Sequence, residues 1–186
     1  MTFRMSALPR GLQAREVRRL ASYLTRKLRL SGEISIAFVP PRRMQQLNYA
    51  YRGKRTATDV LSFSFRNADS RLLPRHFQNK NERGEILFCA RELYLRARKN
   101  SMTMPRYFYL LLIHSVLHLQ GFDHETNRDA VRMEKKEAVF LAGFAPLLPE
   151  AAALKLERKA VRLKQQTRKK SLTSGRGVTG FAVAHR

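Results

Sequence analysis

Cysteine is almost missing from this chain, and its scarcity limits where the protein can work. Cys89 is the only cysteine among 186 residues, so no disulfide can form within the chain. This usage is typical of a reducing compartment, and we expect a cytoplasmic protein. Cys89 stands in the apolar run ILFCA, a setting that favours a packed thiol over a reactive one.

Long apolar runs are missing as well. The sequence has no stretch of about 18 apolar residues, the length that a membrane-spanning helix needs. Its first residues also lack the charged, apolar and cleavage regions of a secretory signal. We therefore expect no membrane partner. The arginine-rich N-terminus leaves a transit peptide as a lesser alternative.

Acidic residues are few compared with basic ones. The chain holds 37 Lys and Arg but only 14 Asp and Glu, a formal net charge of +23. That charge far exceeds what solubility requires and predicts a polyanionic partner. Residues 1–150 contain 27 basic and 13 acidic residues, whereas residues 151–186 contain ten and one.

The change in composition near residue 150 divides the chain. We expect one domain over 1–148 and a basic C-terminal extension over 149–186, part helical and part disordered. The extension either adds electrostatic affinity for a polyanion or is a solvated end without a specific target.

Hydrophobic periodicity within the first 148 residues predicts a single α+β domain. The predicted helices cover residues 11–28, 42–52, 91–100, 107–119 and 128–144, and the predicted strands cover 33–40, 59–65 and 85–90. Residues 66–84 are polar, and this composition predicts a long loop. Alternation of strands and helices favours a small mixed, mostly parallel sheet packed with helices.

Histidine is also rare, which makes its placement informative. Three of the five histidines, His114, His118 and His124, lie in HSVLHLQGFDH with the spacing H-x3-H-x5-H. Residues four apart share one helix face, so His114 and His118 can direct two imidazoles at one point. Gly121 can end the helix, so that His124 approaches from the side.

Three neutral nitrogen ligands with one open position are typical of a catalytic zinc site at the end of a helix. The competing interpretation, that each histidine is an ordinary core residue, does not account for their clustering. Metzincin metalloproteases have the same spacing, with a general-base Glu after the first His. Ser115 stands there in this chain, and its hydroxyl cannot accept a proton near neutral pH. Peptide hydrolysis by that mechanism is therefore disfavoured.

A second polar segment, LNYAYRGKRTATDVLSF, precedes the predicted strand at 59–65. In it Arg52, Lys54 and Arg55 surround Gly53, where we expect the helix to end. A basic turn entering a sheet can hold a phosphate, and a guanidinium can hold two phosphate oxygens at once. Because the whole chain is basic, a solvated arginine is the competing interpretation.

Together these segments resemble the YbeY family of bacterial metal-dependent endoribonucleases. Family members carry HGxLHLxGYDH, which residues 114–124 match except at Ser115 and Phe122, and the chain also has LNxxYRGK, TDVLSF and GEI. The resemblance spans about residues 34–144. The departures upstream of the histidines are Ala57 and Ser64 in place of the usual Pro, and Glu85 in place of Asp.

The resemblance implies one zinc ion per chain, held by His114, His118 and His124, with Arg52 as the functional arginine. It implies an endoribonuclease that cuts single-stranded ribosomal RNA, matures the 3′ end of 16S rRNA and acts in ribosome quality control. Its partners would be the small ribosomal subunit and the proteins of that subunit. Two alternatives stay open: a non-catalytic ribosome assembly factor with a structural zinc, and a zinc hydrolase of small substrates. The open fourth metal position argues against the first and Ser115 against the second.

Overall fold

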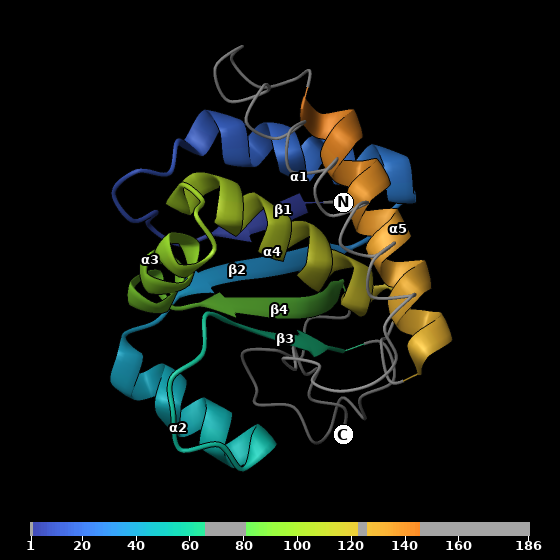
Figure 1. The fold of residues 1–186 in the computed structure, drawn as a ribbon. Coiled ribbons are helices and arrows are strands. Elements are labelled where there is room, and N and C mark those ends of the chain that lie inside the picture. The colour runs from blue at the N-terminus through green and yellow to red at the C-terminus, as the bar shows by residue number, and fades with distance from the viewer. Residues whose placement is uncertain (1, 66–80, 123–125, 146–186) are drawn as a thin grey trace. The chain divides into compact units, whose positions relative to one another are not determined.

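The computed structural model describes residues 2–65, 81–122 and 126–145, which form four strands and five helices (Figure 1). The strands are β1 (Thr2–Met5), β2 (Glu33–Phe38), β3 (Val60–Ser64) and β4 (Glu82–Phe88). The helices are α1 (Ala14–Leu28), α2 (Pro41–Arg52), α3 (Ala90–Lys99), α4 (Met104–Leu119) and α5 (Asn127–Phe144). The strands and α1 to α4 belong to one compact unit and α5 to another, so α5 is described by itself.

The sheet has the strand order β1-β2-β4-β3. β2 pairs in parallel with both β1 and β4, and β3 pairs antiparallel with β4. The connection from β2 to β4 passes through α2 and β3, which gives the chain room to return in the same direction. The predicted α+β fold with a mixed, mostly parallel sheet is confirmed.

Helix α4 packs on one face of the sheet through an aromatic cluster. Its Phe108 lies with ring centroids 4.8 Å from Phe88 of β4 and 5.9 Å from Phe38 of β2. Ile34, Ile36 and Ile86 are wholly or almost wholly buried on the same strands. Twelve residues of α4 are buried, so this helix belongs to the core along most of its length. The side chains at its C-terminal end are therefore held by packing on several sides.

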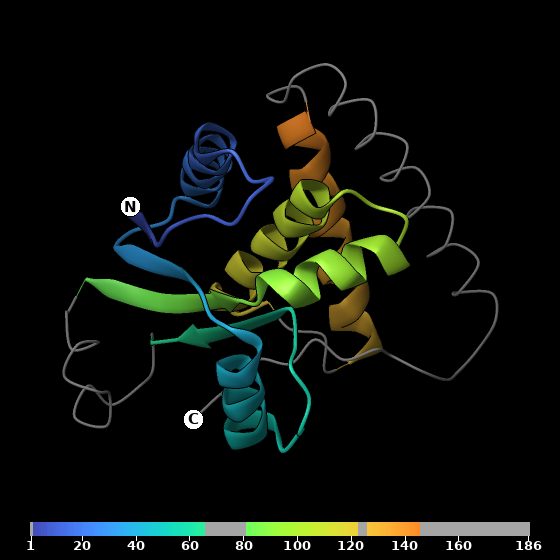
Figure 2. The same ribbon diagram turned by 90° about the vertical axis from the view of Figure 1, so that its left-hand side faces the viewer.

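Helix α2 contributes to a second cluster, in which Met44 packs with Leu61, Leu87 and Cys89. In Figures 1 and 2 α1 and α2 lie on opposite sides of the strands. Burial raises the pKa of the Cys89 thiol, which agrees with the prediction of a packed cysteine.

Gly84 of β4 allows the end of α4 to approach the sheet. A Cβ at this position would lie 2.5 Å from the Phe63 carbonyl oxygen and 2.8 Å from Cδ2 of Leu119. Both distances are shorter than a carbon can tolerate, so only glycine fits between β3 and the last residue of α4. The close approach fixes the height of the C-terminal turn of α4 above the sheet.

The sequence-based boundaries were wrong at three places. Strand β1 was not predicted, because four residues are too few for alternation to be recognised; β2 supplies the partner that makes Thr2–Met5 a strand. β4 begins at Glu82, inside the segment 66–84 expected to be a loop, of which 66–80 lie outside the described residues. α4 begins at Met104, since Pro105 fits a first helical turn, where its missing N–H is not needed.

The other predicted helices and strands agree with the structure to within three residues at each boundary; α1, for example, begins at Ala14 where residue 11 was predicted. α5 follows Thr126, whose hydroxyl accepts a hydrogen bond from the backbone N–H of Asp129 at 3.2 Å. No helix in the described parts of the chain is long and apolar enough to cross a membrane. The predicted extension at 149–186 lies outside the described residues, and its boundary stays a prediction.

Candidate functional site

The two histidines of α4 meet as their spacing predicts. Nε2 of His114 lies 3.0 Å from Nε2 of His118, and the ring centroids are 4.5 Å apart. Both residues are buried, with exposed fractions of 8% and 3%. Two nitrogens bound at about 2.0–2.1 Å to one tetrahedral ion lie roughly 3.3 Å apart. The imidazole pair therefore fits two adjacent ligand positions of a metal ion.

The chain turns directly after this pair. Gly121 has a positive φ of 85°, its N–H donates to the His118 carbonyl at 2.8 Å, and the Phe122 N–H donates to the Leu117 carbonyl at 3.1 Å. These two hydrogen bonds form the glycine-terminated helix end that the sequence predicted. A Cβ on Gly121 would meet nothing within 4 Å, so its backbone conformation, not space, requires glycine.

The third predicted ligand, His124, lies outside the described residues, so the three-histidine site stays a prediction. Among the residues that the structure describes, no three His, Cys, Asp or Glu side chains form a group that could hold a metal. Ser115, which follows the first histidine, is wholly buried, so its hydroxyl is not presented to a substrate.

Arg52 is the last residue of α2, and Gly53 follows it with a left-handed φ of 66°. The N–H of Gly53 donates to the Tyr49 carbonyl at 2.9 Å, which ends the helix as predicted. Arg52 is half-buried, while Lys54 and Arg55 are exposed. Burial lowers the pKa of the Arg52 guanidinium; Asp59 opposes that shift and Arg96 adds to it. Of the three cations in the predicted basic turn, Arg52 is thus the one that is half-buried and lies near the charges of Asp59 and Arg96.

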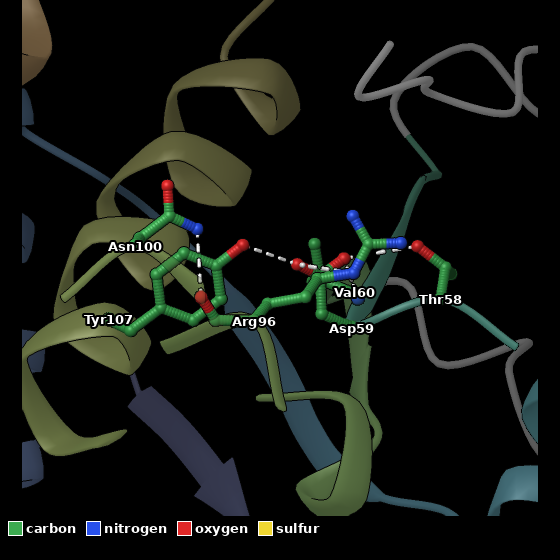
Figure 3. A network of polar contacts seen from close by, with 6 residues as sticks. All are labelled: Thr58, Asp59, Val60, Arg96, Asn100 and Tyr107. Atoms are coloured by element: carbon green, nitrogen blue, oxygen red, sulfur yellow. Dashed lines mark hydrogen bonds and ion pairs between the residues drawn. The ribbon is translucent and has the colours of Figure 1, made fainter. Parts of the chain in front are cut away.

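Asp59 is the centre of a polar network that the sequence did not identify (Figure 3). One carboxylate oxygen, Oδ2, accepts a hydrogen bond from the Tyr107 hydroxyl at 2.6 Å and lies 3.5 Å from Nε of Arg96. The other, Oδ1, accepts from the Thr58 hydroxyl at 3.0 Å and from the Val60 N–H at 3.1 Å. The Asp59 side chain is 1% exposed, so these donors replace the water that a buried carboxylate loses.

The network joins three separate parts of the chain. Asp59 precedes β3, Arg96 belongs to α3, and Tyr107 belongs to α4. Burial, followed by the nearby Asp59 carboxylate, raises the pKa of the Tyr107 hydroxyl, which therefore stays a donor. The side chain of Arg96 is 44% exposed, so part of its guanidinium reaches solvent while Nε faces Asp59. Two guanidinium groups near one carboxylate leave an excess of positive charge that suits a phosphate.

Tyr107 and His114 relate this network to the imidazole pair. They are seven residues apart on α4, which is two helical turns and about 10 Å of rise. The sequence contained Asp59 within TDVLSF, but nothing in that motif revealed its partners. Tyr107 lies 48 positions further along the chain, and local spacing carries no information at that separation.

Comparison with known proteins shows which family this chain resembles. The family model Endoribonuclease YbeY matches residues 10–145. A protein named Endoribonuclease YbeY from Polaromonas sp. is 33% identical over 138 residues, which are 74% of this chain and 78% of that protein. A protein of the same name from Anaeromyxobacter sp. is 39% identical over 143 residues, 74% of this chain and 69% of that protein.

A solved structure is similar in fold. The solution structure of a protein from Thermotoga maritima superposes with a TM-score of 0.50 at 20% identity, covering 94% of this chain and 100% of the other. At that identity the likeness concerns the fold alone. The family model and the relatives go further, because they cover most of the chain and include the segments that hold Arg52, Asp59 and both described histidines. The chain therefore belongs to the Endoribonuclease YbeY family.

Proposed function

We propose that this chain is a metal-dependent endoribonuclease that cuts single-stranded ribosomal RNA, takes part in maturing the 3′ end of 16S rRNA and acts in ribosome quality control. Membership in a family of endoribonucleases supports RNA as the substrate and the phosphodiester bond as the target. The net charge of +23 supports a polyanionic substrate. The observation that carries the metal dependence is the 3.0 Å separation of the His114 and His118 Nε2 atoms.

The metal in this proposal is one zinc ion per chain, with His114, His118 and His124 as its ligands. Neutral imidazole nitrogens suit zinc, and three of them leave one position for the substrate. When bound, the ion supplies Lewis acidity at the scissile phosphate. Burial of His114 and His118 within the packed helix limits their rotamers, so the nitrogens are oriented before any substrate arrives.

Arg52 serves in this proposal as the group that meets negative charge on the phosphate. Its guanidinium can hold two phosphate oxygens, and its partly buried position near Asp59 restricts where it points. Arg96 supports the same charge from α3, since its Nε is engaged by Asp59 while the side chain is 44% exposed. Asp59 offsets part of the repulsion between the two cations, and its own side chain, 1% exposed, does not contact the substrate.

The partners in this proposal are ribosomal RNA, the small ribosomal subunit and its proteins, in the cytoplasm. An enzyme that trims ribosomal RNA must reach it during assembly, and the excess of basic residues favours contact with phosphate along the RNA. This part of the proposal depends on the family, and the geometry of α4 does not carry it.

The test is cleavage of a short single-stranded RNA with the sequence of the 16S 3′ end, beside the same strand in a duplex. The zinc-loaded protein should cut the single strand, and His114→Ala should not. Ser115→Ala is the matched control, because Ser115 neighbours His114 on the same helix and is wholly buried. An active His114→Ala would overturn the proposed site. RNA bound but uncut by every form would instead make the chain an assembly factor.

A further inference from the structure

Helix α2 exposes two aromatic side chains beside Arg52. Tyr49 is 52% exposed and Tyr51 is 46% exposed, unusually high fractions for large aromatic residues. The guanidinium carbon of Arg55 lies 5.3 Å from the centroid of the Tyr49 ring. The ring of Tyr51 meets that of Phe63 on β3 edge to face, with centroids 4.8 Å apart. Both tyrosines are thus held in place although they face solvent.

The charge around these rings selects among possible partners. Between Pro41 and Arg55 the chain has five basic residues and no acidic one. A protein partner held through exposed tyrosines would have to be acidic, whereas single-stranded RNA offers both negative charge and flat apolar bases. Aromatic rings bind unpaired bases by stacking, and arginine adds cation–π attraction. The combination favours RNA.

The exposed Tyr49 lies on the same side of α2 as Arg52. Tyr49 and Arg52 are three residues apart on α2, so their side chains emerge on the same side of the helix. A base stacked on Tyr49 brings its own phosphate, or the next one along the strand, toward Arg52. A base within a duplex cannot stack there, because its faces are already covered by neighbouring bases.

We propose that Tyr49, with the Arg55 guanidinium over one face of its ring, is a stacking platform on its other face for one unpaired base of single-stranded RNA and thereby places a phosphate at Arg52. This inference rests on the proposed function, since it takes RNA as the substrate. It names the side chain that makes the enzyme prefer single strands over duplexes.

A second tyrosine offers a matched control. Tyr94 on α3 is 54% exposed and has Arg98 at 5.9 Å from its ring, which is nearly the same chemistry as the pair at Tyr49. It is two residues from Arg96, and residues at that spacing do not share a helix face. Since Arg96 turns toward Asp59, Tyr94 points to another side and should not stack the same base.

The experiment uses the full chain and requires no cleavage. The protein has no tryptophan, so Tyr49→Trp and Tyr94→Trp each introduce a single fluorophore. Each variant is titrated, without added metal, with a short single-stranded RNA, with its duplex and with an abasic strand of equal length and charge. We expect the single strand to quench Tyr49→Trp strongly and the duplex and the abasic strand to quench it weakly, whereas Tyr94→Trp should not distinguish the three.

Affinity provides an independent measurement. Tyr49→Ala should weaken binding of the single strand on the order of tenfold, as expected for loss of one stacked base, and leave duplex binding unchanged. Tyr49→Phe should keep wild-type affinity because the ring remains. Equal quenching of Tyr49→Trp by the abasic strand, or equal losses for single strand and duplex in Tyr49→Ala, would overturn the platform.

The outcomes separate this inference from the proposed function. If the wild-type protein cuts RNA but Tyr49→Ala binds single strands normally, the platform is wrong and the endoribonuclease stands. If no form cuts RNA but the base-dependent quenching of Tyr49→Trp is present, the platform stands and the endoribonuclease fails.

Discussion

The two ends of helix α4 carry polar groups that are assembled in opposite ways. At the C-terminal end, His114 and His118 are one turn apart on the same helix, with Nε2 atoms 3.0 Å from each other. At the N-terminal end, Tyr107 meets Asp59 and Arg96, which come from other parts of the chain. The geometry of the first group is set by the helix itself, whereas that of the second exists only after the strands and helices have packed.

The two groups therefore differ in how closely they are tied to the fold. The mutual geometry of the imidazole pair depends on α4 alone, because both partners belong to that helix. The Asp59 network links α3, α4 and the start of β3, so a change there alters the fold as well as the electrostatic environment of Arg52. Substitutions at the two ends should therefore have distinguishable consequences.

The largest effect is expected at the histidines. Replacing His114 and His118 together by Ala should remove the metal completely, from about one zinc ion per chain to none, because a single remaining imidazole cannot hold the ion. Elemental analysis of the purified protein measures this, and circular dichroism should show a retained fold. Ser115→Ala should keep the metal. Unchanged metal content in the double variant would contradict the assignment of these ligands.

Arg52→Ala should have the next largest effect, on rate. If Arg52 meets charge that develops only in the transition state, single-turnover cleavage should fall roughly 10²–10³-fold while zinc content stays the same. RNA affinity should change little, since many other basic residues attract the strand. Arg43→Ala, at an exposed arginine of the same helix, is the control and should retain cleavage. Equal losses in rate at saturation and in affinity would make Arg52 a positioning residue instead.

Tyr107→Phe should have a smaller effect, but on both stability and rate. It removes one donor from the buried Asp59 carboxylate, and a hydrogen bond to a charged group is worth about 1.5–3 kcal/mol. Urea unfolding should show that loss. Cleavage should also decrease, because Asp59 is the carboxylate near Arg52.

Tyr109→Phe is the matched control for this prediction. The Tyr109 hydroxyl also donates to a carboxylate, that of Glu16 on α1, and burial also raises its pKa. This variant should lose stability without losing cleavage. If both tyrosine variants retain the same fraction of wild-type cleavage, the Asp59 network has no part in the reaction.

The sequence predicted the C-terminal group of α4 and missed the N-terminal one, for a physical reason. Helical spacing alone brings His114 and His118 together, and Gly121 is the sequence signal for the turn after them. Asp59 and Tyr107 are brought together only by packing of α4 on the sheet, which no local pattern encodes. Likewise, β1 could not be foreseen from four residues that need β2 as a partner.

Arg52 was predicted only in part from the sequence. Gly53 revealed where its helix ends, but the charges that surround its guanidinium come from Asp59 and Arg96. His124 and the extension over 149–186 lie outside the described residues, so the third ligand and the function of the basic segment stay predictions from the sequence.

Glu85 on β4 extends the comparison to a half-buried carboxylate whose neighbour is another acid. Asp59 has four donors or cations at its oxygens, whereas Glu85 lies near a second acid, Glu82. Burial, followed by repulsion from Glu82, raises the pKa of Glu85 to about 7, with Arg4 opposing the shift. The folded protein therefore keeps the Glu85 proton over a pH range in which the unfolded chain has already released it.

The sign of the pH dependence follows from that pKa. Below the unfolded-state pKa Glu85 is protonated in both states and causes no penalty; as pH rises from there to about 7, the unfolded chain loses this proton before the folded protein does, so the penalty grows and is complete above about 7. Glu85→Gln removes this penalty, so the variant should be more stable than the wild type by on the order of 1–3 kcal/mol at pH 8. The gain should disappear near pH 4, where a neutral glutamic acid and a glutamine differ little. Urea unfolding at several pH values measures the difference, and Glu134→Gln, at an exposed glutamate of α5, should show no such trend. If Glu85→Gln stabilised the protein equally at pH 4 and pH 8, the destabilisation by Glu85 would come from packing and not from its ionisation. The difference between Glu85 and Asp59 would then not be one of charge.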